Sequence, residues 1–176
     1  MSDGYDFARL KVMVVDDNEH MRLLLATILK AFGINRIYEL MSAEDAWLRM
    51  VETPCDIVIA DWVMEGMSGL EFVKKLRNSS DSPNPFVPII MLTGHTSLER
   101  VRQARDAGVN EFLAKPVSSK MLMSRVTAVI EHPRSFVRTR SYFGPCRRRR
   151  REEKYEGPER RTDDSAKAKT DGKEAA

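Results

Sequence analysis

Five short apolar runs alternate with amphipathic stretches over the first 133 residues, and this alternation constrains the fold more than any other feature. Each apolar run has the length of a strand, and each is followed by a stretch whose apolar residues recur at helical spacing. The expected strands cover residues 10–15, 37–40, 56–60, 88–92 and 111–114. Such alternation is typical of an α/β fold in which a parallel sheet is covered by helices on both faces.

The stretches between these runs carry the signals that start and stop helices. Ser42 and Ser118 are suited to cap helix starts, and Gly33 and Gly108 stand where helices should end. In the first helix we expect one inward face, made of Met21, Leu24, Leu25, Ile28, Leu29 and Phe32. The sequence therefore predicts a doubly wound domain of five β-then-α units.

Polar side chains stand at the carboxyl ends of the expected strands. Asp16 and Asp17 follow the first strand, Asp61 the third, Thr93 the fourth and Lys115 the fifth. In open parallel sheets, ligands bind at this edge. A single acid there is more often an ordinary loop residue, but the complete set is not explained that way. Three carboxylates would repel one another, and a hard cation such as Mg²⁺ would relieve the repulsion.

This combination resembles the CheY-like receiver domains of response regulators over nearly all of residues 8–132. The resemblance implies a flavodoxin-like sheet of five parallel strands in the order 2-1-3-4-5. It also implies that Asp61 accepts a phosphoryl group in the presence of Mg²⁺. Asp17 would bind the metal directly and Asp16 partly through water, together with Asp61 and the backbone carbonyl of Val63.

The same resemblance assigns roles to other residues around the acceptor. Thr93 would bond the phosphoryl group and move on activation, and Lys115 would pair with a phosphoryl oxygen. Phe112 matches the aromatic switch position, which turns inward as Thr93 moves. Glu65 departs from the pattern, since proline is common there, and its carboxylate adds negative charge near the site. We expect no catalysis on a small substrate beyond self-phosphorylation.

The charge of the chain is divided unevenly. Through Pro133 there are 15 Lys or Arg and 18 Asp or Glu, whereas the remainder has 14 and 8. Residues 134–176 are too few and too polar to form a second core. We therefore expect a receiver domain over 1–133, an arginine-rich binding segment over 134–161 and a disordered tail over 162–176.

The pattern Y-x-G-P-x-R-R occurs twice in the arginine-rich segment, 13 residues apart. Arginine can bond guanine and phosphate in fork geometry, and aromatic rings can stack on bases. A repeated guanine reader fits cyclic di-GMP, which carries two guanines. The residues expected to contact it are Tyr142, Phe143, Gly144, Pro145, Arg147, Arg148, Arg149, Tyr155, Gly157, Pro158, Glu159, Arg160 and Arg161.

Receiver and repeat together resemble the Cle proteins, CheY-like receivers whose arginine-rich C-terminal extension binds cyclic di-GMP. In that family the ligand directs the protein to the flagellar motor, where it tunes motility and surface attachment. The resemblance thus implies cyclic di-GMP and a flagellar switch protein as partners, besides a histidine kinase. We expect the ligand to order the tail against the receiver near Phe112 and residues 122–130.

Two other functions remain open. The tail could be inert, leaving a receiver driven by phosphorylation alone. Alternatively, residues 147–151, all arginine, could bind DNA or RNA, although Glu152 and Glu153 follow closely and would weaken a phosphate track.

No run approaches the roughly 20 apolar residues of a membrane span, and Cys55 and Cys146 form no disulfide framework. These features favour a cytoplasmic protein. The resemblance to the Cle proteins implies that such a protein would be recruited to the motor or cell pole.

Overall fold

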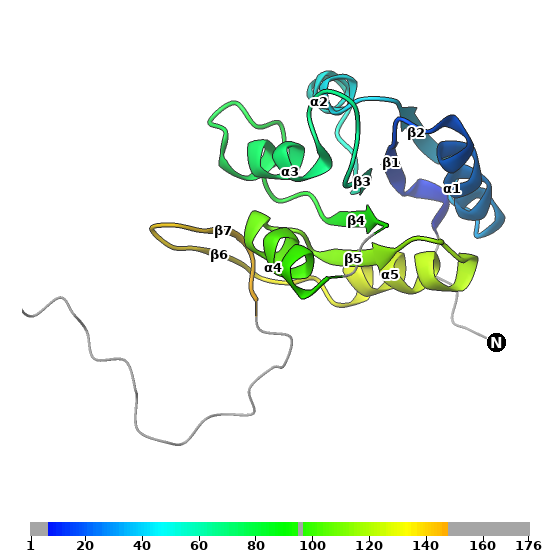
Figure 1. The fold of residues 1–176 in the computed structure, drawn as a ribbon. Coiled ribbons are helices and arrows are strands. Elements are labelled where there is room, and N and C mark those ends of the chain that lie inside the picture. The colour runs from blue at the N-terminus through cyan, green and yellow to red at the C-terminus, as the bar shows by residue number, and fades with distance from the viewer. Residues whose placement is uncertain (1–6, 95–96, 148–176) are drawn as a thin grey trace, which may run out of the picture.

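The sheet has the predicted class and strand order. A computed structural model describes residues 7–94 and 97–147 (Figure 1). The strands are β1 (Lys11–Val15), β2 (Arg36–Leu40), β3 (Ile57–Asp61), β4 (Ile89–Thr93) and β5 (Glu111–Ala114). They pair in parallel in the order β2-β1-β3-β4-β5. The doubly wound five-stranded fold expected from the sequence is confirmed.

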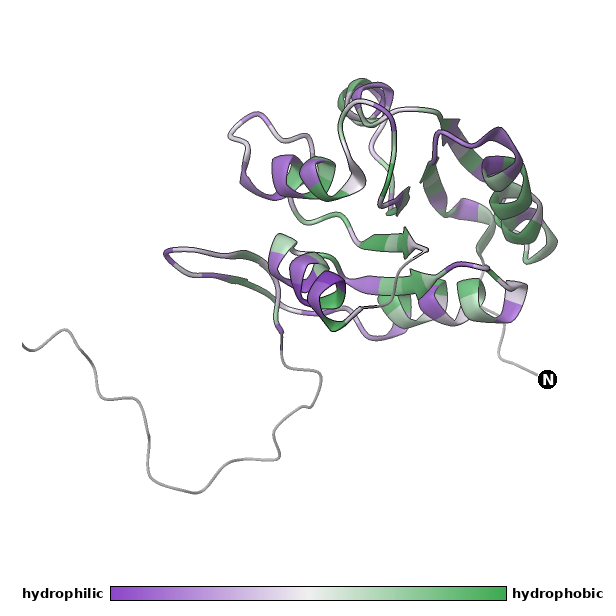
Figure 2. Ribbon diagram, viewed as in Figure 1, coloured by the Kyte–Doolittle hydropathy of each residue, from purple (hydrophilic) through white to green (hydrophobic). Residues whose placement is uncertain are grey.

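Helices cover both faces of the sheet, after a short 3₁₀ turn at Phe7–Arg9. They are α1 (Glu19–Ala31), α2 (Ala43–Glu52), α3 (Gly69–Asn78), α4 (Leu98–Ala107) and α5 (Ser119–Glu131). Apolar residues of α1 and α5 pack on one face, and those of α2, α3 and α4 on the other. Figure 2 shows hydrophobic residues gathered on the strands and on the helix faces turned toward them. Both β3 and β4 are therefore buried along their whole length. None of the helices in the described residues is long and apolar enough to cross a membrane.

The inward face of α1 is narrower than expected. Leu25, Ile28 and Leu29 are buried, but Leu24 is 43% exposed and Phe32 is 45% exposed. Leu24 lies beside the buried stripe, because each residue turns about 100° around the helix. Phe32 follows the last helical residue as its C-cap, so helical spacing no longer places its ring.

Packed structure continues beyond Pro133, the residue at which the receiver domain was expected to end. Strands β6 (Phe136–Arg138) and β7 (Phe143–Pro145) form an antiparallel hairpin. Phe143 is only 8% exposed, and its ring lies 5.3 Å from that of Phe86 and 5.7 Å from that of Phe136. The expectation rested on the charge of the segment. Three aromatic rings from separate segments instead supply a small apolar cluster of their own.

The hairpin is anchored by Arg77 of α3, a buried cation. Its side chain is 2% exposed and lies over the Phe136 ring at 5.1 Å. The guanidinium donates hydrogen bonds of 2.7–3.1 Å to the carbonyls of Pro85, Val87 and Gly108 and to the side-chain oxygen of Asn110. Burial lowers the pKa of Arg77 to about 9, so the group remains protonated at neutral pH. One side chain therefore ties α3, the segment before β4, the α4–β5 turn and the hairpin together.

The hairpin lies at the amino ends of β4 and β5, which are preceded by Val87 and Asn110 (Figure 1). The bonding of Arg77 and the close approach of Gly144 to Gly108 hold it there, and Arg147 after the hairpin lines a pocket together with Phe112. A Cβ on Gly144 would lie 2.9 Å from the Cα of Gly108. The ordering of the tail near Phe112 and residues 122–130 was expected of the ligand-bound protein and stays a prediction.

Candidate functional site

Three carboxylates meet at the carboxyl ends of β1 and β3. Val15 and Ala60 are partners in the sheet, so the acids that follow them lie side by side. One oxygen from each of Asp16, Asp17 and Asp61 lies within 4.8 Å of the others. Asp16 is fully buried and Asp61 is 7% exposed, whereas Asp17 is exposed. This arrangement agrees with the grouping expected from the strand ends.

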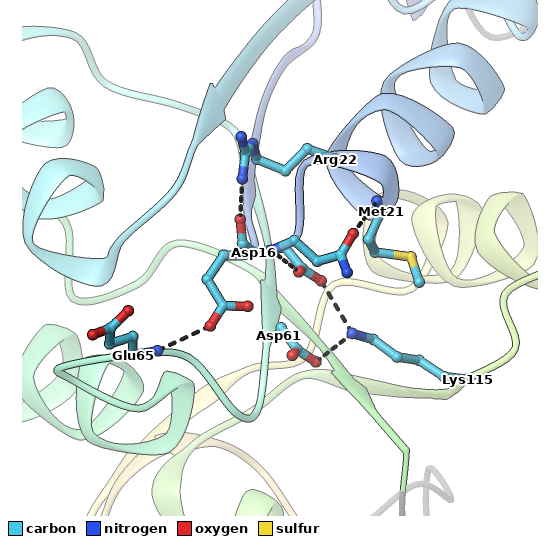
Figure 3. A network of polar contacts seen from close by, with 8 residues as sticks. Asp16, Met21, Arg22, Asp61, Glu65 and Lys115 are labelled. Atoms are coloured by element: carbon cyan, nitrogen blue, oxygen red, sulfur yellow. Dashed lines mark hydrogen bonds and ion pairs between the residues drawn. The ribbon is translucent and has the colours of Figure 1, made fainter.

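Lys115 neutralises two of the three acids (Figure 3). Its Nζ lies 2.9 Å from Asp61 Oδ1 and 3.1 Å from Asp16 Oδ2. Burial raises the pKa of Asp61, and the hydrogen bond and charge of Lys115 offset only part of that effect. Burial alone would lower the pKa of Lys115, but the two carboxylates outweigh it and raise it. The lysine is therefore held charged against the acids. The peptide bond between Lys115 and Pro116 is cis.

Backbone amides orient the acids that follow β1. The N–H of Asn18 donates to Asp16 Oδ1 at 2.9 Å, and that of Glu65 donates to Asp17 Oδ2 at 3.0 Å. Figure 3 shows the Glu65 carboxylate turned away from Asp61, so this residue meets the site through its amide. Arg22 donates to the carbonyl of Asp16 at 2.7 Å. The sequence reasoning did not single out Arg22, because its partner is a backbone atom.

The remaining predicted residues lie around this centre. Thr93 ends β4 and is fully buried, and its carbonyl accepts from the Lys115 amide at 2.8 Å. Phe112 is half-buried in β5, where it pairs with Met91 and packs on the α2–α3–α4 face. Val63 is exposed in the loop after β3. Thr93 and Lys115 thus lie beside the acids, whereas Phe112 lies within β5, three residues before Lys115.

Gly69 is a structural requirement that the sequence did not reveal. It begins α3, and a Cβ at this position would lie 1.9 Å from the backbone oxygen of Asp61. Real side chains do not tolerate that distance, so only glycine lets α3 start so close to the acceptor strand. The sequence signal is the glycine eight residues after Asp61, at the end of DWVMEGMSG. The contact itself depends on the folded loop.

The donor set fits Mg²⁺. Carboxylate and carbonyl oxygens are the ligands that this hard ion takes, usually with several waters. Asp16, Asp17 and Asp61 offer the carboxylates, and exposure of Asp17 leaves the cluster open to solvent on one side. The site can hold a divalent cation while Lys115 keeps its charge near the acceptor.

Replacing Asp17 with asparagine should weaken Mg²⁺ binding by about tenfold or more, since it removes one of the charges that attract the ion. Asp17 is exposed, so the fold should persist. Titration with Mg²⁺ alone, followed through the fluorescence of Trp62 beside the acceptor, measures the affinity. Glu52→Gln, an exposed acid at the end of α2, is the control. Equal affinities of both variants would contradict the assignment of Asp17 as a ligand.

The residues predicted to bind cyclic di-GMP are divided by the structure. Phe143, Gly144 and Pro145 are buried in β7, so they serve the packing of the hairpin. The Arg147 guanidinium lies over the Tyr142 ring at 4.1 Å. The others, Arg148, Arg149, Tyr155, Gly157, Pro158, Glu159, Arg160 and Arg161, lie outside the described residues.

Comparisons with known proteins agree with this geometry. The family model described as response regulator receiver domain matches residues 12–127. The chain is 34% identical over 122 residues to Chemotaxis protein CheY1 of Helicobacter pylori, covering 69% of this chain and 97% of that protein. It superposes on CheY4 of Vibrio cholerae with a TM-score of 0.63 at 30% identity, over 68% of this chain and 98% of the other. A receiver protein from Pseudomonas putida gives a TM-score of 0.61 at 33% identity, with coverage of 68% and 97%. The match to the family model ends before the hairpin.

Proposed function

Because the chain belongs to the response regulator receiver family, we propose that it works as a CheY-like regulator that is phosphorylated on Asp61. The arrangement around Asp61 carries the proposal. This carboxylate lies 2.9 Å from a lysine ammonium and beside two further acids at the edge where such sheets bind ligands. The phosphoryl donor would be a histidine kinase or a small acyl phosphate.

Asp61, Lys115 and Thr93 each have a separate role in the phosphoryl transfer. An Asp61 oxygen attacks phosphorus, the bond from phosphorus to the donor's leaving group breaks, and an acyl phosphate forms on the side chain. Lys115 moves from Asp61 to a phosphoryl oxygen, and the Thr93 hydroxyl donates to another. Mg²⁺ bound by Asp16, Asp17, Asp61 and the Val63 carbonyl would neutralise developing charge. The catalytic contribution is therefore positioning and electrostatics.

The arginine-rich segment is proposed to bind cyclic di-GMP and to direct the protein to a switch protein of the flagellar motor. The repeat of tyrosine, Gly-Pro and two arginines supports the ligand. The pairing of Arg147 with the face of Tyr142 places an arginine on an aromatic ring within the first copy of the repeat. Chemotaxis proteins of Helicobacter pylori and Vibrio cholerae are among the proteins similar to this chain, which supports a partner in motility.

Calorimetric titration of cyclic di-GMP into the full chain tests the ligand. We expect saturable binding, weakened about tenfold or more in the double variant Arg160→Ala, Arg161→Ala, because each arginine can make a bidentate bond to phosphate or guanine. Cyclic di-AMP is the matched control ligand, since it has the same phosphates and lacks the guanine edge. Absence of binding, or equal affinity for both dinucleotides, would refute the proposal for the tail.

A second candidate is a receiver driven by phosphorylation alone. The observation that favours it is the burial of Phe143, Gly144 and Pro145, which uses the first copy of the repeat to pack the hairpin. In that case the full chain would accept a phosphoryl group on Asp61 but would not bind either dinucleotide.

A further inference from the structure

A pocket of about 280 Å³ lies between α4, β5 and the base of the hairpin. Its floor is apolar and is formed by Val101, Ala104, Val109 and Phe112. We propose that this pocket receives one guanine nucleotide half of cyclic di-GMP, with the base on the apolar floor and a phosphate among the surrounding arginines. The inference rests on the proposed binding of cyclic di-GMP and adds the place and the regulation of that binding.

Three arginines from three segments line the pocket: Arg105 of α4, Arg134 before the hairpin and Arg147 after it. Asp106 pairs with two of them, at 3.0 Å from Arg105 Nε and 3.4 Å from Arg147 Nη2. The Nε of Arg134 is buried and has no hydrogen-bond partner among the described residues. Arg134 otherwise donates to the backbone carbonyls of Asn110 and Cys146, so among the described residues Asp106 is the one acid paired with these arginines. An anion with several acceptor oxygens would complement them, and phosphate has that chemistry.

The shape of the pocket restricts what can enter. Its volume of about 280 Å³ lies just below the roughly 300–1,000 Å³ of small-molecule sites, so it suits one half of a cyclic dinucleotide. A flat base matches an apolar floor flanked by guanidinium groups, which stack on rings and bond the O6 and N7 atoms of guanine.

The floor also connects the pocket to the phosphorylation site. Phe112 and Ala114 lie on β5, and Ala114 pairs with Thr93 at the end of β4. A ligand packed on Phe112 therefore changes the free energy of moving that ring, which the resemblance to receivers implies is the switch aromatic. Binding energies are reciprocal. Phosphorylation of Asp61 should accordingly change the affinity for the ligand by the same factor as the ligand changes the phosphorylation equilibrium.

Two charge reversals on α4 of the full-length protein test the location. Arg105 and Arg102 are both exposed, but Arg102 lines a separate groove between α3 and α4. We expect Arg105→Glu to weaken cyclic di-GMP binding about tenfold or more, and Arg102→Glu, which makes the same change in net charge, to weaken it less than about threefold. Calorimetry gives both affinities.

Methyl NMR of the unaltered protein supplies a readout that does not depend on variants. Saturating cyclic di-GMP should shift the methyl signals of Val101 and Val109 and leave those of Val12 on β1 in place. Equal affinities of the two variants with no shift at Val101 and Val109 would overturn the pocket while binding through the tail stands. No binding by the unaltered protein would refute the inference together with the proposed function. The same shifts from inorganic phosphate alone would refute recognition of the base.

Discussion

Replacing Asp61 with asparagine should abolish phosphorylation of the protein by acetyl phosphate in the presence of Mg²⁺. Asparagine has nearly the same shape but offers no anionic oxygen to attack phosphorus. Neither neighbouring acid should substitute readily, because Asp16 is fully buried and is held by Lys115 and the Asn18 amide, and Asp17 is held by the Glu65 amide. Intact-protein mass spectrometry follows the added phosphoryl group, and the expected loss is complete.

Asp56→Asn is the matched control for this experiment. Asp56 immediately precedes β3, the strand that ends with Asp61, is exposed, and accepts from the Lys11 amide at 2.8 Å. This variant should be phosphorylated like the unaltered protein. Modification that persists in Asp61→Asn would place the acceptor elsewhere, and loss in both variants would point to damage to the strand.

The stability of the Asp61→Asn protein checks that it is folded. Burial raises the pKa of Asp61 in the folded state. A carboxyl with a raised pKa favours folding at low pH, and this contribution is lost as the pH rises through the folded-state pKa. At neutral pH the ionised Asp61 therefore opposes folding, and asparagine removes the cost of burying that charge together with its repulsion with Asp16. We expect thermal unfolding of the variant at an equal or higher temperature.

Replacing Arg77 with methionine should lower the free energy of unfolding by about 3 kcal/mol or more. Methionine keeps much of the length and leaves the carbonyls of Pro85, Val87 and Gly108 without their donor in a buried place. It also removes the contact with the Phe136 ring, so the hairpin should detach first. Urea denaturation measures the free energy, and exchange of the β6 and β7 amides reports the hairpin.

Lys74→Met separates this effect from a loss of charge. Lys74 is on the same helix and exposed, and substitution of such a residue changes stability by about 0.5 kcal/mol or less. If Arg77→Met were as mild as Lys74→Met, the four hydrogen bonds of Arg77 would not hold the domain and the hairpin would be an independent appendage.

Local patterns were sufficient for the sheet and for most of the site. The alternation of strand and helix is a repeat over short distances, and parallel strands joined by helices have their carboxyl ends at one edge. The positions of Asp16, Asp17, Asp61 and Lys115 in the chain were therefore enough to predict that they lie together. Their roles came from the resemblance of the whole set to receivers, since a single strand-end acid carries little information.

The sequence by itself determined which residues form the sheet and which acids stand at its edge, because periodicity and chain order suffice for both. Only the tertiary structure decided the fate of Arg77, Gly69 and Phe143. Each depends on neighbours from distant segments: carbonyls that bury a cation, a backbone oxygen 1.9 Å from an absent Cβ, and rings that turn a charged tail into a packed hairpin. Composition reports how many charges a segment carries, but burial and partners decide whether those charges face water, a backbone or a ligand.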